Sequence, residues 1–108
     1  MNNNINLNSP GYVYVKVSNQ SGYVARFKVT YILRGRIVRE QSRNISLGQD
    51  DKLFIPEEAI SIVLEVDQNL IIGWRPFHFE KFKSPINKCY ELDGTAFNPS
   101  CNEVNCVN

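Results

Sequence analysis

The sequence is poor in the groups that catalysis and metal binding need. Its 108 residues include one histidine, His78, and three cysteines, and no Cys-x-x-Cys or His-x-His pair accompanies them. The spacing of a structural zinc site, a glycine-rich phosphate loop and a nucleophile elbow are all missing. The adjacent carboxylates Asp50-Asp51 and Glu57-Glu58 would point apart on a strand, which disfavours a catalytic dyad. We therefore expect a protein that is not an enzyme and uses no cofactor and no metal.

A strong charge and long apolar runs are also missing. The formal net charge is +1, and four arginines between residues 34 and 43 lie close to acidic residues, which favours a solvated strand face. Because binding a duplex needs a concentrated basic face, we expect no nucleic-acid partner. No apolar run approaches the roughly 20 residues of a membrane-spanning helix. Residues 1–10 lack the features of a secretory signal, so export would need a signal removed from a longer precursor or another route.

What the sequence does have is a series of short runs rich in β-branched and aromatic residues. Arg34-Gly35 separates two of these runs and predicts a tight hairpin. No segment has the pattern of an amphipathic helix. We predict strands over residues 12–17, 24–33, 36–39, 52–55, 61–66, 77–80 and 89–92.

Seven or eight short strands separated by turn residues indicate one all-β domain: a single antiparallel two-sheet β-sandwich of immunoglobulin-like type. We expect the sandwich over residues 11–100, an extended Asn-rich N-terminal arm over 1–10 and a Cys-containing tail over 101–108. Within the sandwich, residues 77–80 alternate with period two. This alternation predicts that Phe77 and Phe79 share an apolar face and that His78 is exposed.

The three cysteines leave several pairings open. An odd number means that at least one thiol is free or bonded to another chain, unless all three are reduced. Cys101 and Cys106 lie in the polar tail, where a local or an intermolecular bridge is sterically easy, whereas Cys89 lies in a predicted strand. All three residues are therefore candidates for a disulfide, within the chain or between chains.

Two turns have an apolar apex. Residues 69–77 place three aliphatic residues, the only tryptophan and a phenylalanine around a turn, and residues 93–99 form a second turn with Phe97 at its apex. The first segment is either buried core or a loop tip that inserts into a membrane interface or a partner, where tryptophan is favoured.

The stretch Ser21–Tyr31 resembles the strand opening of the C-terminal β-sandwich domain of the cholesterol-dependent, or thiol-activated, cytolysins, which typically shows Ser-Gly-Ala-Tyr-Val-Ala-x-Phe. Three further similarities follow in the family's order, from about Ser18 to Pro99. They are Ile55-Pro56-x-x-Ala59, Trp74-Arg75 where the family's Trp-rich loop ends, and Gly94-Thr95-Ala96-Phe97-Asn98-Pro99 where the family has Gly-Thr-Thr-Leu-x-Pro.

The chain also departs from the family pattern. Ala96-Phe97 replaces the Thr-Leu pair that recognises sterol, and a site that reads a hydroxyl discriminates poorly without its partner group. The loop before Tyr23 lacks the family's alanine, Ser84 stands where an apolar residue is expected, and the Trp-rich loop has one tryptophan and no cysteine. The resemblance thus implies that the scaffold is kept and the sterol-reading tip is changed.

The resemblance implies a stand-alone, non-enzymatic recognition or adhesion module that cannot form a pore alone. Its partner would be a membrane surface, a glycan or a protein receptor, and its location extracellular or on a bacterial cell or spore surface. Candidate binding residues are Leu70, Ile71, Ile72, Trp74, Arg75, Ala96 and Phe97.

The alternative is a structural subunit that assembles with its own copies into a filament, layer or crystal. The arm, with Ile5 and Leu7 as its aliphatic residues, would add a strand to a neighbour's sheet edge. Cysteines in the tail would lock the homo-oligomer covalently.

Overall fold

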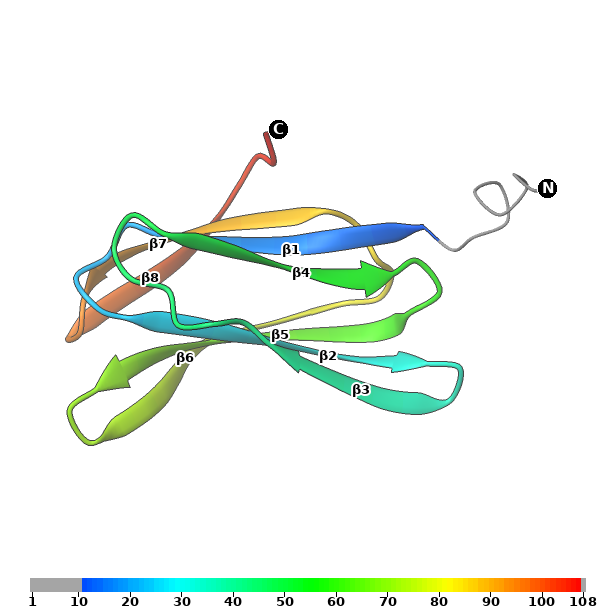
Figure 1. Ribbon diagram of the computed structural model, residues 1–108, viewed down its shortest axis with the longest axis horizontal. Helices are drawn as coiled ribbons and strands as arrows, with labels where there is room; N and C mark the ends of the chain where they lie inside the picture. Colours follow the sequence, from blue (N-terminus) through cyan, green and yellow to red (C-terminus); the bar gives the residue numbers. More distant parts are fainter. Residues whose placement is uncertain (1–10, 108) are drawn as a thin grey trace.

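The computed structural model describes residues 11–107, which form eight strands (Figure 1). Four of the seven connections contain Gly, Pro or Asn. The strands are β1 (Tyr12–Asn19), β2 (Ala25–Leu33), β3 (Arg36–Gln41), β4 (Asp50–Pro56), β5 (Ile60–Leu70), β6 (Gly73–Phe82), β7 (Lys88–Thr95) and β8 (Asn98–Val104). The described residues contain no helix, and therefore none that could cross a membrane.

The strands form two four-stranded sheets that face each other. The first sheet has the order β4-β1-β7-β8 and the second has the order β3-β2-β5-β6. All neighbours are antiparallel except β1 and β7, which run parallel. The predicted all-β two-sheet sandwich is confirmed. The predicted hairpin is confirmed too, since Arg34 and Gly35 join β2 to β3 with positive φ values of 52° and 79°.

The core lies between the sheets and follows the alternation of the central strands. Every second residue of β2 is buried from Ala25 to Tyr31, and the residues between them are partly exposed. A strand turns alternate side chains to opposite faces, so each sheet buries one face against the other. The largest fully buried side chains are Tyr90, Phe27, Ile45, Ile55, Ile62, Leu64, Leu92, Gln68, Val15, Val17, Val29 and Val66.

The alternation predicted for residues 77–80 is wrong. His78 pairs with Val66 and Glu80 pairs with Leu64, so both polar side chains share the face of buried residues. Phe79 is exposed on the other face. One reason is a register shift between Val66 and Asp67, which changes the face to which the following β6 residues point. A second reason is that β6 is an edge strand, and its inner side meets a polar group of β7, the Lys88 ammonium. Sequence alternation alone does not reveal that neighbour.

The chain continues as a strand beyond residue 100. β8 pairs with β7 up to Val104, opposite Cys89, so the sheet includes the first part of the segment expected as a tail. Cys89 and Cys106 form a disulfide, and Cys101 is a free thiol.

A local bridge between Cys101 and Cys106 is therefore wrong. Cys101 pairs with the buried Leu92 and packs against the core. Cys89 points to the opposite face, because it directly precedes the inward-facing Tyr90 and successive side chains of a strand alternate between faces. Residue Ile5 and residue Leu7, expected to act in assembly, lie outside the described residues.

Candidate functional site

Four connections gather at one end of the sandwich, on the left in Figure 1. We call this end the tip end. It consists of the β1–β2 loop (20–24), the β3–β4 loop (42–49), the β5–β6 turn (71–72) and the β7–β8 turn (96–97).

The β1–β2 loop joins the other three connections through backbone hydrogen bonds. The loop accepts one bond from the end of β5 and donates two bonds to β7, and the β3–β4 loop donates one bond to Asn19, the last residue of β1. They are Asn69 N–H to Val24 O (2.8 Å), Gly22 N–H to Gly94 O (3.0 Å), Gln20 N–H to Leu92 O (2.8 Å) and Gly48 N–H to Asn19 O (2.7 Å). The β1–β2 loop and Asn19 are thus bonded to every other part of the tip end, and we call these residues, 19–24, the hub.

Buried polar side chains hold this hub in place. Asn19 is completely buried, and its amide donates hydrogen bonds to the carbonyl oxygens of Tyr23 (2.7 Å) and Ile45 (2.8 Å). Its side-chain oxygen accepts a bond from the Ser21 backbone N–H at 2.8 Å. Buried polar groups of this kind are costly to leave unpaired, so the network fixes one loop conformation.

A tight turn also shapes the β7–β8 connection. Gly94 has a φ of 90°, and a Cβ there would lie 2.2 Å from the carbonyl oxygen of Asn98. Any other residue would clash with the backbone of the opposing strand. The Tyr23 hydroxyl donates to the carbonyl oxygen of Asp93 at 3.0 Å and ties this turn to the hub.

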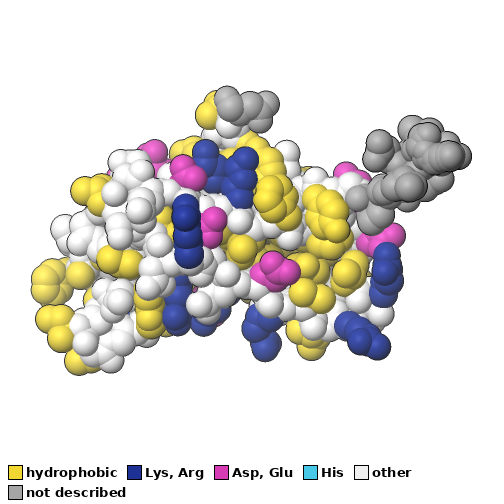
Figure 2. Space-filling view, viewed as in Figure 1, with side chains coloured by type: hydrophobic (Ala, Val, Ile, Leu, Met, Phe, Trp, Pro, Cys, Tyr) yellow, Lys and Arg dark blue, Asp and Glu magenta, His cyan; other side chains and the backbone are white. Residues whose placement is uncertain are grey.

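Outside this framework, apolar side chains project into solvent. Ile71, Ile72 and Phe97 each expose at least 94% of their surface. Figure 2 shows hydrophobic side chains projecting at the left-hand end of the molecule, where Figure 1 places the two turns. The apex of the segment around residue 71 is therefore exposed, whereas Phe77 of the same segment packs against the core.

The two turns enclose a groove of about 460 Å³. We call it the tip groove. It brings together six of the seven candidate binding residues, although the two turns are more than 20 positions apart in the sequence. Its lining residues are Asn69, Leu70, Ile71, Ile72, Arg75, Ala96 and Phe97.

The seventh candidate, Trp74, lies beside the tip groove and does not line it. It is half-buried, and the Arg26 guanidinium lies 4.1 Å from the centre of its ring. Arg26 in turn pairs with the buried carboxylate of Asp67 at 3.0 Å. This cation–π stack fixes the indole below the apex of the β5–β6 turn.

Sequence reasoning missed Leu47 in the β3–β4 loop, which exposes 66% of its surface. Its loop is bonded to the hub through Gly48. The signal that could have found it is a lone leucine between Ser46 and Gly48 in a polar turn.

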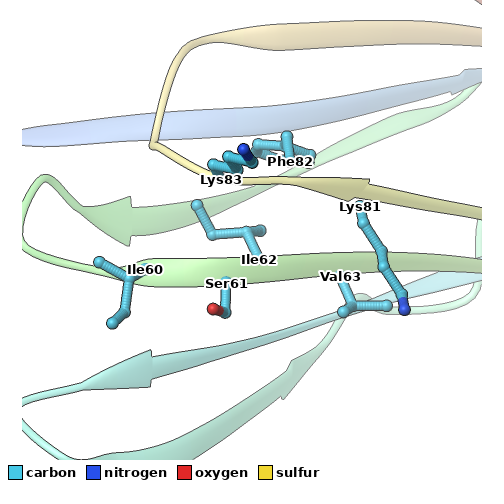
Figure 3. Close-up of a pocket in the computed structure, with 7 residues that line it drawn as sticks. All are labelled: Ile60, Ser61, Ile62, Val63, Lys81, Phe82 and Lys83. Atoms are coloured by element: carbon cyan, nitrogen blue, oxygen red, sulfur yellow. The ribbon is translucent and has the colours of Figure 1, made fainter.

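A second cavity of about 500 Å³ lies at the opposite end of the sandwich (Figure 3). We call it the distal groove. Ile62 and Phe82 lie on the side of their strands that faces the first sheet, whereas the Ser61 hydroxyl points the other way. The lining residues are Ile60, Ser61, Ile62, Val63, Lys81, Phe82 and Lys83.

The titratable groups between β6 and β7 form ion pairs that have no catalytic arrangement. The Lys88 ammonium lies 2.8 Å from Glu80 and 3.5 Å from Glu103. Burial would raise the pKa of Glu80, but the hydrogen bonds from Lys88, Tyr90 and His78, together with the Lys88 charge, outweigh burial and hold that pKa below its usual value. Burial and the Glu80 charge raise the pKa of the Cys101 thiol to about 12, which makes it a poor nucleophile at neutral pH.

The described residues hold no group of three or more side chains that could bind a metal ion. The lining of the tip groove contains no Ser, Thr, Cys or His that could act as a nucleophile or general base. The chemistry available in the tip groove is apolar contact with one cationic group, Arg75.

Comparison with known proteins rests on structure, because the sequence matches no family model and no curated protein. Listeriolysin O is 14% identical, with a TM-score of 0.66 over 91% of this chain. Suilysin from Streptococcus suis is 15% identical, with a TM-score of 0.65 over 92% of this chain. This chain covers 23% and 24% of those two toxin chains.

The membrane-binding domain of pneumolysin, solved by itself, is similar over its whole length. It is 10% identical, with a TM-score of 0.65, and the match covers 91% of this chain and 100% of that domain. The resemblance to the cytolysins inferred from the sequence is therefore confirmed as a resemblance of fold, and the fold of this chain is that of the pneumolysin membrane-binding domain.

Proposed function

We propose that the protein is a recognition module that docks on a lipid membrane through its tip end. The observation that carries the proposal is the group formed by Ile71, Ile72 and Phe97, three almost fully exposed apolar side chains on neighbouring turns. Exposed apolar groups gathered at one place mark interaction sites more often than scattered ones do. The similarity in fold to a membrane-binding domain supports the same conclusion.

The shape of the tip end favours a lipid surface over a folded receptor. The apolar side chains stand on hairpin turns that project from a rigid hub, and a projecting tip can insert between lipid headgroups. Burial of one such side chain contributes roughly 1.5–3 kcal/mol. Three of them together can supply reversible binding.

The tip groove lacks a group dedicated to a sterol hydroxyl. By the resemblance in sequence, Ala96 and Phe97 correspond to the family's Thr-Leu pair, and Asn69 supplies the one polar uncharged side chain in the lining. We therefore propose docking that does not depend on sterol.

The test is sedimentation of the protein with phospholipid vesicles that lack sterol. The double variant Ile71→Ser/Ile72→Ser should lose at least about thirtyfold in affinity, since two side chains would no longer be buried. Ile37→Ser is the matched control, because Ile37 is 70% exposed on β3 near the opposite end.

Equal losses in both variants, or binding that appears only when sterol is added, would contradict the proposal. Binding to a glycan or to a protein, in the absence of any vesicle binding, would also contradict the proposal and would show that the partner is a receptor of that kind.

A second candidate function is self-assembly, favoured by the distal groove. The carbonyl oxygen of Gly11 accepts a bond from the Glu57 N–H at 3.0 Å, so the described chain starts beside the β4–β5 turn that leads to Ile60. In an extended arm Ile5 and Leu7 would share one face. We propose that, if the protein assembles, these residues of one copy occupy the distal groove of the next.

Light scattering with and without reductant tests this candidate. Deletion of residues 1–9 and the substitution Ile60→Asp should each leave monomers. Assembly that persists in the truncated chain would contradict the role of the arm.

A further inference from the structure

The four connections of the tip end contain no carboxylate. Residues 20–24, 42–49, 69–77 and 94–100, which are these connections with the strand ends beside the two hairpin turns, include no Asp and no Glu, although the whole chain has 11 of them and Asp50-Asp51 and Asp93 directly adjoin these segments. The charged residues in these segments are two arginines, Arg43 and Arg75. The tip end is thus apolar and cationic, whereas the protein as a whole is close to neutral.

The two arginines differ in their surroundings. The Arg43 guanidinium lies 4.0 Å from the Asp51 carboxylate and donates a hydrogen bond to the Asp50 carbonyl oxygen at 3.1 Å. Arg75 is exposed and has no ion pair within the described part of the chain. Its charge is therefore available to a ligand.

Arg75 also lines the tip groove together with Ile71, Ile72 and Phe97. A cation at the rim of an apolar groove complements a molecule with an acyl chain and an anionic headgroup. A guanidinium can bind two phosphate oxygens at once, which makes arginine the preferred partner of phosphate. A neutral sterol offers no such group.

We infer that the tip end selects membranes rich in anionic phospholipid, with a lipid phosphate bound at Arg75 and the apolar part of the lipid against Ile71, Ile72 and Phe97. This inference rests on the proposed membrane docking and specifies which class of lipid the tip end binds. The lining of the tip groove contains no Asp and no Glu, so no like charge beside Arg75 would repel the anionic surface.

One cationic side chain at an anionic surface corresponds to about a fivefold gain in affinity. The gain should shrink as salt is added, since a screening length of about 10 Å at 0.1 M salt falls to about 3 Å at 1 M. Apolar insertion does not weaken in this way.

The experiment compares vesicles of pure phosphatidylcholine with vesicles in which about one third of the lipid is phosphatidylglycerol. The wild type should bind the anionic vesicles at least about fivefold more tightly, and Arg75→Gln should remove most of that preference, measured as the ratio of its affinities for the two kinds of vesicle. Lys83→Gln is the matched control, because Lys83 is an exposed cation at the distal groove. It removes the same charge and should keep the preference.

Each result separates the two claims. Equal binding of the wild type to both vesicles would overturn the lipid preference and leave membrane docking intact. A preference that Arg75→Gln keeps, or that Lys83→Gln loses equally, would assign the effect to net charge and overturn the role of Arg75. Binding to neither vesicle would overturn both claims.

Discussion

The two ends of the sandwich close the same eight strands in different ways. At the tip end the polar groups are inside, where Asn19 and Ser21 bond to the backbone, and the apolar groups are outside on the turns. At the opposite end the turns carry charges of both signs in solvent, and Arg34 pairs with Glu58 at 2.6 Å.

The opposite end shows the ordinary solution for a soluble protein, in which exposed turns are charged and weak surface ion pairs form. The tip end has the opposite arrangement, with apolar side chains exposed on the turns and polar side chains buried beneath them. An exposed apolar apex lowers solubility, and a buried polar network adds desolvation cost, so neither feature is expected from stability alone. This difference indicates that the tip end is adapted to contact another surface.

The largest expected effect comes from breaking the hub of the tip end. Asn19→Ala leaves the Tyr23 and Ile45 carbonyl oxygens without their buried donor and should lower the free energy of unfolding by about 3–4 kcal/mol. Denaturant unfolding measures this loss. Asn44→Ala, at an exposed position, should change stability by less than about 0.5 kcal/mol. Similar effects of the two changes would refute the role of the hub.

Removal of the disulfide should lower the stability of the fold without changing vesicle binding by the tip end. Cys89 lies near the start of β7, away from the β7–β8 turn, and is 17 positions from Cys106. Cys106→Ser should lower stability by about 3 kcal/mol, because the unfolded chain loses its cross-link. Reductant should lower the melting temperature of the wild type and leave that of Cys106→Ser unchanged.

Vesicle binding is the second measurement on this variant. At a temperature where it is folded, Cys106→Ser should bind as the wild type does. Impaired binding by the folded variant would show that the disulfide shapes the tip end.

Phe97→Ser should have the opposite profile to Cys106→Ser. Phe97 exposes 97% of its surface, so its loss should change the free energy of unfolding by less than about 0.5 kcal/mol. Vesicle affinity should fall about tenfold. A stability loss above about 1 kcal/mol would place Phe97 in the core and contradict its assignment to the tip groove.

The smallest effect is expected between the ends, at Glu80. Its pKa is held below the usual value, so its stabilising contribution is present above the unfolded-state pKa and is lost as the pH falls through the lower folded-state pKa. Glu80→Gln should cost about 1 kcal/mol at pH 7. The difference from the wild type should shrink as the pH falls below the unfolded-state pKa of about 4.3 and disappear once the pH is below the lower folded-state pKa. A difference that does not change with pH would refute the ion pair with Lys88.

The fold could be predicted where local sequence decides the structure. Arg34-Gly35 specifies a tight turn by itself, because a glycine with positive φ follows a residue that can adopt the same region. The buried alternation of β2 is equally local. The order of the strands within each sheet, and the parallel pairing of β1 with β7, depend on contacts between distant segments.

The features that sequence could not predict depend on which strands become neighbours. Glu80 faces inward because Lys88 of the other sheet meets it there. The disulfide joins Cys89 to Cys106 because Cys101 points toward the core. Ile71 and Phe97 were both candidate binding residues, but the groove between them exists because turns from two different sheets reach the same end.

The most direct test of membrane docking uses the only tryptophan as a native reporter. Trp74 lies two residues beyond Ile72, which corresponds to about 7 Å along an extended strand, so it should reach the headgroup region when the tip inserts. We would measure its fluorescence with vesicles whose lipids carry a quencher near the headgroup. The account predicts quenching that Ile71→Ser/Ile72→Ser abolishes. Binding to the vesicles without any quenching of Trp74 would show that another surface docks, and would contradict the assignment of the tip end.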